Sequence, residues 1–141
     1  MIVLDTDHIS EFQDPRSPLG ARLSQRLAGA GPIPIATTII SYEELMRGWL
    51  AAINKQPAGE RQVVAYDSLA EFLAFYKGWN LPRFDQPAAK EFERLRAQRV
   101  RIGTMDLKIA VIVLQRGAKL LSANLRNFRQ VPGLTVEDWL S

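Results

Sequence analysis

The sequence predicts an α/β protein, more narrowly an α/β/α sandwich around a short parallel sheet. Short apolar runs of strand length alternate with longer segments whose apolar residues recur at helical spacing. This alternation favours a parallel sheet covered by helices. The first apolar run, residues 1–4, stops at Asp5, and residues 107–114 are apolar nearly all round, which is typical of a buried helix.

Bulk composition indicates an ordinary folded protein. The chain has 141 residues, 47% hydrophobic and 23% charged, so we expect a single domain over 1–141. The absence of cysteine excludes disulfides and thiolate zinc sites and fits a cytoplasmic location. No run approaches the ~20 apolar residues of a membrane span, and no basic leader precedes the first run, so we expect neither membrane insertion nor a secretory signal. The net charge of +3 permits an anionic partner such as nucleic acid.

In the N-terminal half, strands are expected at 1–4 and 33–36, the second tolerating Pro34 near its start. Asp7 or Thr6 is expected to cap a short helix that runs through Phe12. A second helix spans 19–28 and ends at the Gly-Ala-Gly-Pro break of 29–32. Two longer helices follow at 37–53 and 60–77, each with one apolar face.

In the C-terminal half, residues 80–85 are expected to be irregular or strand-like. Pro87 at a first-turn position starts a helix that ends near 98. The buried helix spans 106–115 and stops at Gly117. A strand at 119–121, a helical turn at 124–128 and a last strand at 134–136 complete the chain.

Polar residues follow the expected strands or open the expected helices. Parallel α/β sheets bind ligands at the carboxyl ends of their strands, so we expect these side chains to converge on one edge. Oxygen donors without cysteine and with one histidine fit a hard cation, Mg²⁺ or Mn²⁺, and two such ions ~4 Å apart would suit phosphoryl chemistry. The candidates are Asp5, Asp7, Glu43, Glu44, Asp106, Ser122 and Asn124.

Most candidates also have a structural interpretation. Asp5 or Asp7 can cap the helix that follows, and aspartate is favoured where Asp106 opens its helix. Ser41 and Glu44 match a capping box, and a helical wheel does not separate Glu44 from Glu43. Asn124 is a natural turn residue, and the lone histidine, His8, is expected to be a surface or cap residue.

Several blocks together carry a family resemblance. They are LDTD at 4–7, SYEELMRG at 41–48, IGTMDLKIA at 102–110, LLSAN at 120–124 with Phe128, and PGLTVEDW at 132–139. In this order and over the whole chain they resemble the PIN-domain family, and within it the VapC-type ribonuclease toxins of type II toxin–antitoxin systems.

The resemblance implies a metal-dependent endoribonuclease that uses Mg²⁺ or Mn²⁺. Its acidic positions fall on Asp5, Glu44 and Asp106, which selects Glu44 over Glu43. The family's fourth acidic position falls on Asn124, which carries no charge. The site would then have three carboxylates, so whether a second metal binds stays open. Ser122 takes the place of the family's threonine. Asp7, often asparagine in relatives, is an additional carboxylate.

The resemblance also implies partners: an RNA substrate, a cognate VapB-like antitoxin and a second copy of the chain in a homodimer. The apolar faces of 37–53 and 60–77 exceed what one sheet layer needs, which favours an interface there. Arginines are candidates for the RNA backbone path, each weighed against an ordinary solvated face. They are Arg47, Arg94, Arg96, Arg99, Arg101, Arg126 and Arg129.

Two alternatives stay open from the sequence. The Asp5-Thr6-Asp7 stretch also resembles the Asp-x-Asp of haloacid-dehalogenase-type phosphatases, in which the first aspartate is the nucleophile. No glycine follows Asp7, no convincing lysine motif is found, and the chain is short for that family. A catalytically quiet PIN-like module that binds RNA or protein is the other alternative, supported mainly by asparagine at position 124.

Overall fold

Four short strands form one parallel sheet in the order β2-β1-β3-β4, in a computed structural model that describes residues 1–141. In the sheet Val3 is the partner of Ala36 on one side and of Leu120 on the other. The second strand begins two residues later than predicted, because Pro34 has no N–H to donate, and the fourth begins one residue later. The strands are β1 (Ile2–Leu4), β2 (Ile35–Thr37), β3 (Lys119–Leu121) and β4 (Thr135–Glu137).

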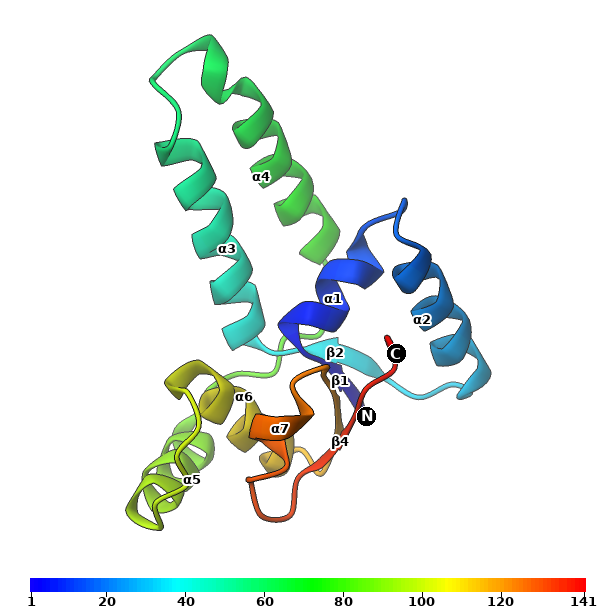
Figure 1. Ribbon diagram of the computed structural model, residues 1–141, viewed down its shortest axis with the longest axis vertical. Coiled ribbons are helices and arrows are strands. Elements are labelled where there is room, and N and C mark those ends of the chain that lie inside the picture. The colour runs from blue at the N-terminus through cyan, green and yellow to red at the C-terminus, as the bar shows by residue number, and fades with distance from the viewer.

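Helices connect the strands as the sequence predicts, and the α/β class is confirmed (Figure 1). A 3-10 turn at Glu60–Gln62 precedes α4, and the 80–85 segment contains no strand. The helices are α1 (Thr6–Gln13), α2 (Pro18–Gly29), α3 (Ile39–Asn54), α4 (Val63–Tyr76), α5 (Gln86–Ala97), α6 (Thr104–Gln115) and α7 (Leu125–Phe128).

The structure decides the N-caps of α1 and α3, for which the sequence offers several adjacent residues. The N-cap of α1 is Asp5 rather than Thr6 or Asp7, because the Asp5 carboxylate accepts from the N–H of Thr6. The N-cap of α3 is Thr38, whose hydroxyl accepts from the N–H of Ser41 at 3.2 Å. The predicted capping box therefore does not form, since Ser41 is already helical and Glu44 is free for another role.

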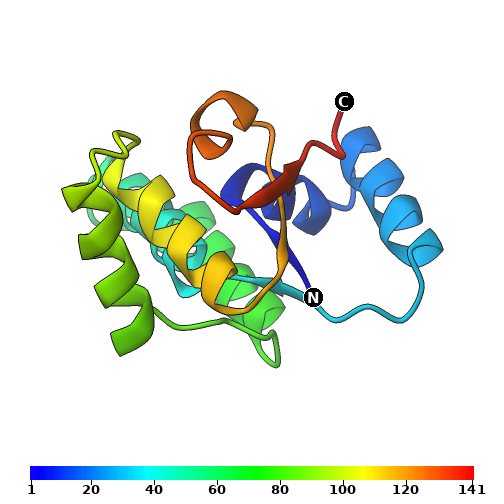
Figure 2. The same cartoon turned by 90° about the horizontal axis from the view of Figure 1, so that it is seen from below.

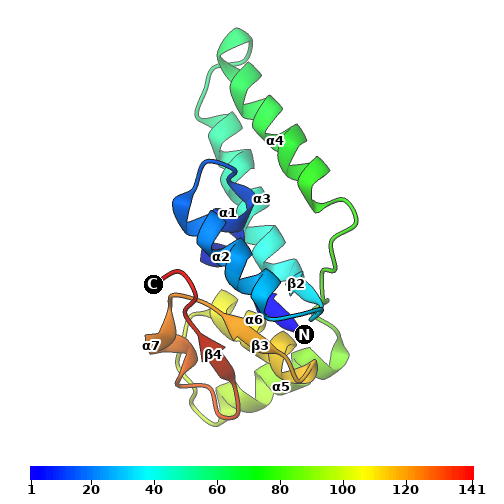
Figure 3. The ribbon, with the colours of Figure 1, turned by 90° about the vertical axis from the view of Figure 1, so that its right-hand side faces the viewer.

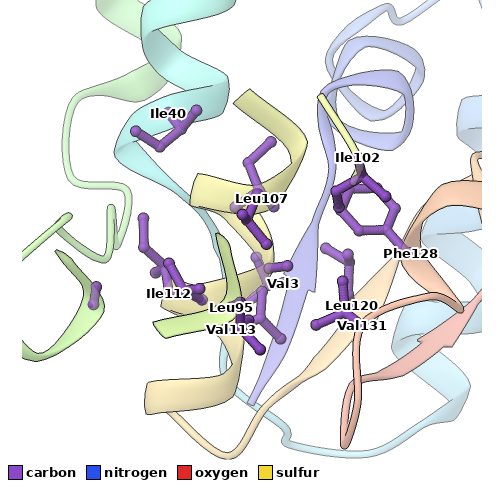
Figure 4. Close-up of a cluster of buried hydrophobic side chains, with 14 of the residues drawn as sticks. Val3, Ile40, Leu95, Ile102, Leu107, Ile112, Val113, Leu120, Phe128 and Val131 are labelled. Carbon is purple, nitrogen blue, oxygen red and sulfur yellow. The ribbon is translucent and has the colours of Figure 1, made fainter. Parts of the chain in front are cut away.

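The two faces of the sheet build two cores, because successive strand residues point to opposite sides. Val3, Ala36 and Leu120 face α5 and α6. Figure 4 shows Leu107, Ile112 and Val113 of α6 in one cluster with Val3, and Phe128 beside Ile102 in the same cluster. On the opposite face Leu4 and Leu121 pack with side chains of α1, α2 and α4. This arrangement is the predicted α/β/α sandwich.

Helices α3 and α4 lie side by side and extend away from the sheet as a hairpin (Figure 1 and Figure 3). Its far half carries exposed apolar side chains, and Val64 is 76% exposed. This matches the predicted surplus of apolar surface on these two helices. None of the helices combines the length and apolarity that crossing a bilayer requires.

Gly20 marks the closest approach of two helices. A Cβ at this position would lie 2.0 Å from the carbonyl oxygen of Glu11, so α1 and α2 meet only because residue 20 has no side chain. Gly29, at the end of the same helix, has nothing within 4 Å of its Cβ position.

We therefore expect Gly20→Ala to lower the free energy of unfolding by about 3 kcal/mol, because backbone must move to accept the methyl group. Gly29→Ala is the matched control, expected to leave stability unchanged or raise it by up to about 1 kcal/mol. Urea denaturation followed by circular dichroism measures both. Equal effects of the two substitutions would contradict the close approach.

Candidate functional site

Asp5 is a buried carboxylate at the carboxyl end of the central strand β1, only 6% exposed. Oδ2 accepts from the hydroxyl of Ser122 at 2.7 Å, and Oδ1 accepts from the N–H of Thr6 at 2.8 Å. Burial raises the pKa of Asp5 from its ordinary 3.8 to about 7; the charges of Asp7 and Asp106 add to the rise, and the Ser122 and Thr6 hydrogen bonds oppose it. The dominant cause is therefore desolvation rather than mutual repulsion among carboxylates.

Glu44 lies in the first half of α3, and its Oε1 is buried without a hydrogen-bond partner. Burial raises the pKa of Glu44, and the negative charge of Asp106 raises it further. The neighbouring Glu43 is different, since its Oε2 accepts from the Arg47 guanidinium at 2.6 Å on the exposed side of the helix. An unpartnered buried carboxylate oxygen is costly unless a cation or donor meets it.

Asp106 lies in the first turn of α6, where the N-terminal end of the helix favours a negative charge. Its Oδ2 accepts from the side-chain amides of Asn124 at 3.1 Å and Asn127 at 3.3 Å. The helix begins at Thr104 after Gly103, which makes no side-chain cap, so Asp106 is not the cap residue.

The turn after β3 connects these acidic residues. Ser122 is fully buried, donates its hydroxyl to Asp5 and accepts from the N–H of Asn124 at 3.0 Å. Asn124 in turn donates to Asp106, so two neighbouring polar residues reach two carboxylates on different elements. Asn124 is thus more than a turn residue, since its amide holds the Asp106 side chain.

Asp7 and His8 lie beside this turn on α1. The N–H of Ala123 donates to Asp7 Oδ2 at 2.9 Å, and His8 Nδ1 is 2.7 Å from Asp7 Oδ1. His8 is completely buried, so the expectation of a surface or cap residue is wrong. Its other nitrogen accepts from the N–H of Trp139, a contact across 131 residues that local sequence patterns do not show.

Asp5, Glu44 and Asp106 lie at the carboxyl edge of the parallel sheet, and the charge of Asp106 acts on the pKa of both other residues. No three carboxylate or imidazole groups enclose a common point as direct ligands of one ion. The donor set fits a hydrated hard cation, because Mg²⁺ commonly keeps several waters and binds one or two carboxylates directly. The orphaned Glu44 Oε1 supports this fit, since it has no donor within the protein.

The candidate arginines fall into two classes. Arg47 pairs with Glu43, Arg94 pairs with Glu91, and Arg96 donates to the carbonyl of Val100 at 2.8 Å. The others are exposed and have no carboxylate within ion-pair distance. These free guanidinium groups belong to Arg99, Arg101, Arg126 and Arg129.

Comparison with known protein families identifies the family of this chain. The family model described as "PIN domain" matches residues 2–134. The chain belongs to the PIN-domain family. The predicted family is confirmed, and membership over nearly the whole chain removes the alternative resemblance to haloacid-dehalogenase-type phosphatases.

Among curated proteins, this PIN domain is similar to the tRNA(fMet)-specific endonuclease VapC of Salmonella typhimurium, with 31% identity over 84 residues. The match covers 57% of this chain and 64% of that protein, so it spans less than two thirds of the relative.

Solved structures share the fold over almost the full length. VapBC2 from Rickettsia felis, bound to a promoter DNA fragment, gives a TM-score of 0.76 at 21% identity, covering 99% of both chains. VapBC-1 from nontypeable Haemophilus influenzae gives 0.76 at 22% identity, covering 100% of both chains.

Sequence reasoning missed three contributors to this PIN-domain site. Asn127 holds Asp106, Thr38 caps α3, and the Thr6 hydroxyl donates to Ser41 at 3.1 Å. The spacing of Asn124 and Asn127 was a usable signal, because residues three apart on a helix share a face. The contact between Thr6 and Ser41 had no such signal, since it depends on β1 and β2 being neighbours.

We expect Asp5→Asn to stabilise the metal-free PIN domain by an amount that grows with pH. At low pH Asp5 is protonated in both states, so the two proteins differ by a constant. Between about pH 4 and 7 the unfolded state ionises while the folded state keeps its proton, so the folded wild type loses stability relative to the variant. The difference reaches on the order of 4 kcal/mol and levels off above pH 7.

Urea denaturation in the presence of EDTA from pH 4 to 8 measures this difference. Comparing the two proteins at each pH cancels the titration of the other carboxylates. A difference that does not change with pH would mean that burial does not raise the pKa of Asp5.

Proposed function

We propose that this PIN domain is a VapC-like toxin: a metal-dependent endoribonuclease that hydrolyses phosphodiester bonds of RNA with Mg²⁺ or Mn²⁺. The observation that carries the proposal is the buried, unpartnered oxygen of Glu44 close to the charge of Asp106 and at the same sheet edge as Asp5. Family membership and the similarity to a VapC endonuclease support the same assignment.

Asp5, Glu44 and Asp106 would hold the cation, directly or through water, with Asn124 completing the site as a neutral residue. Such a cation supplies Lewis-acid chemistry, by making a hydroxide nucleophile available near neutral pH and by offsetting charge that develops on the phosphate. Ser122 holds Asp5 in place, and Asn124 and Asn127 hold Asp106. Because Asp5 has a raised pKa, its proton must leave before a cation can bind, which makes cation affinity rise toward pH 7.

We propose that RNA follows the exposed arginines without carboxylate partners. Arg99 and Arg101 lie in the loop that leads into α6, and Arg126 follows Asn124 on α7. That loop leads into the helix that carries Asp106, and Asn127 of α7 donates to Asp106, so phosphates held there would pass close to the acidic residues. Arg47 and Arg94 are less suited, since each already pairs with a glutamate.

We propose that the partner is a VapB-like antitoxin in the cytoplasm, because the similar structures are VapBC complexes. A hollow of about 380 Å³ between α1, α3 and α4 is open to such a partner, and Leu45 and Trp49 contribute its apolar wall. The exposed apolar tip of the α3–α4 hairpin, which includes Val63, Val64 and Tyr66, is proposed to meet a second copy of the chain in a homodimer.

Glu44→Gln is expected to lower kcat for RNA cleavage by at least about 100-fold, because the carboxylate next to Asp106 loses its charge. Glu43→Gln is the matched control: it removes a carboxylate one position earlier on the same helix and is expected to keep activity within about twofold, since an exposed ion pair contributes little. Purified protein is incubated with labelled RNA and Mg²⁺ or Mn²⁺, and cleavage is followed over time.

Binding of RNA without cleavage by the wild type would favour the quiet RNA-binding module over the nuclease. Equal losses in the two glutamate variants would remove Glu44 from the site.

Arg101→Ala and Arg126→Ala are each expected to weaken RNA binding and to reduce the slope of log affinity against log salt by about 1. Arg94→Ala is the control, because its guanidinium already pairs with Glu91. Affinity is measured with a non-cleavable RNA at several salt concentrations. An unchanged slope in the first two variants, or an equal change in the control, would contradict the proposed path.

A further inference from the structure

The only histidine of the chain, His8, is completely buried beside the acidic site and makes two hydrogen bonds in opposite directions. Nδ1 is 2.7 Å from Asp7 Oδ1, and Nε2 is 3.1 Å from the backbone nitrogen of Trp139. One imidazole therefore joins the start of α1 to the C-terminal segment that follows β4.

These contacts define where the imidazole proton lies. A backbone N–H can only donate, so Trp139 requires a bare Nε2 that accepts. The single proton of a neutral imidazole is then on Nδ1, from which it donates to Asp7. Asp138 Oδ1 lies 3.7 Å from Nε2 but already accepts from the N–H of Leu140 at 2.8 Å.

Asp7 connects His8 to the turn after β3. Its Oδ1 accepts from His8 and its Oδ2 accepts from the N–H of Ala123, so each carboxylate oxygen holds a protein donor. Ala123 lies between Ser122, which donates to Asp5, and Asn124, which donates to Asp106. Hydrogen bonds from Trp139 through His8 and Asp7 to Ala123, and the backbone of the turn from Ser122 to Asn124, thus connect the C-terminal segment to two of the site carboxylates.

The far end of this network is itself anchored. The C-terminal segment 138–140 leaves β4 and runs to the side of α2, as Figure 2 shows. The Trp139 ring packs in the core on that face of the sheet, and the Arg26 guanidinium lies 4.6 Å from its centroid. The indole N–H donates to Glu137 Oε2 at 2.7 Å, which ties the ring to the end of β4.

We propose that His8 is a positioning residue for the ribonuclease site: as the neutral Nδ1–H tautomer it fixes Asp7 on the C-terminal segment, and Asp7 then fixes the turn that carries Ser122 and Asn124. Asp7 acts through these hydrogen bonds and not as a cation ligand. The inference rests on the proposed function for its effect on catalysis, while the network itself is testable without RNA.

Two substitutions separate the two bonds of His8. In His8→Asn the side-chain amide nitrogen takes the place of Nδ1, so the bond to Asp7 is kept and the acceptor for Trp139 is lost. In His8→Gln the side-chain oxygen reaches the place of Nε2, so the bond to Trp139 is kept and the donor to Asp7 is lost. Each variant is the control for the other.

The first measurement is the imidazole nitrogen spectrum of the tag-free, ¹⁵N-labelled wild type in EDTA at neutral pH. With a single histidine, one spin system reports the tautomer directly. We expect a proton on Nδ1 and none on Nε2. A proton on Nε2, or a doubly protonated ring between Asp7 and Asp138, would overturn the proposal even if neither variant folds.

The second measurement is residue-specific. His8→Gln is expected to move the backbone amide signal of Ala123 and the side-chain amide signal of Asn124, and His8→Asn the backbone amide signal of Trp139. If both variants move the same signals, His8 only fills space and the positioning role is wrong.

The third measurement is RNA cleavage beside the melting temperature. His8→Gln is expected to lower kcat about 10- to 100-fold, as loss of an outer hydrogen-bond partner of a metal site does, with KM within about threefold. His8→Asn is expected to keep kcat within about threefold while its melting temperature falls, since a half-buried N–H loses its acceptor. If activity follows melting temperature in both variants, the positioning role is wrong. If the wild type cleaves no RNA, the proposed function is wrong, and the first two measurements decide whether the hydrogen-bond network exists.

Discussion

The arrangement of this PIN domain depends on one buried carboxylate at the end of its central strand. Asp5 follows β1, which pairs with β2 on one side and β3 on the other, so its side chain emerges where three chain segments meet. Removing a carboxylate from water is unfavourable unless donors or a cation meet it. Ser122 and the start of α1 supply the donors, and the raised pKa shows that they offset only part of the cost of burial.

This constraint explains the polar residues around Asp5. Ser122 is buried where it reaches Asp5, Asn124 follows and reaches Asp106, and the N–H of Ala123 between them donates to Asp7. Glu44 keeps one buried oxygen, Oε1, without a hydrogen-bond partner. Acidic groups whose hydrogen bonds are incomplete favour cation binding, because one positive charge offsets the cost of desolvating several carboxylates at once.

The α3–α4 hairpin is packed at its base and exposed at its far end. Its base contributes Tyr42, Phe72 and Tyr76 to an aromatic cluster on one face of the sheet. Its far half has no layer to cover and leaves Val63 and Val64 exposed. Exposed apolar surface of this kind is typical of protein contacts, so the part of the molecule that is proposed to bind a second copy lies away from the edge that is proposed to act on RNA.

Local pattern determined the strands, the helices, the buried character of α6 and the choice of Asp5 and Asp106 as site candidates, since periodicity and residue type act over a few residues. By itself it favours a turn role for Asn124, which the family resemblance selects as a site residue. The wheel could not separate Glu44 from Glu43, because both lie on the same turn; in the folded chain Oε1 of Glu44 is buried, while Glu43 pairs with Arg47 on the same helix. The cap of α1 stayed open between Asp5, Thr6 and Asp7, and that of α3 was misplaced, for a related reason: several adjacent residues can cap, and the end of each strand decides which one does. Only the tertiary structure decided the role of His8, since its partners, Asp7 and Trp139, are brought to it by a sheet whose outer strand comes from the other end of the chain.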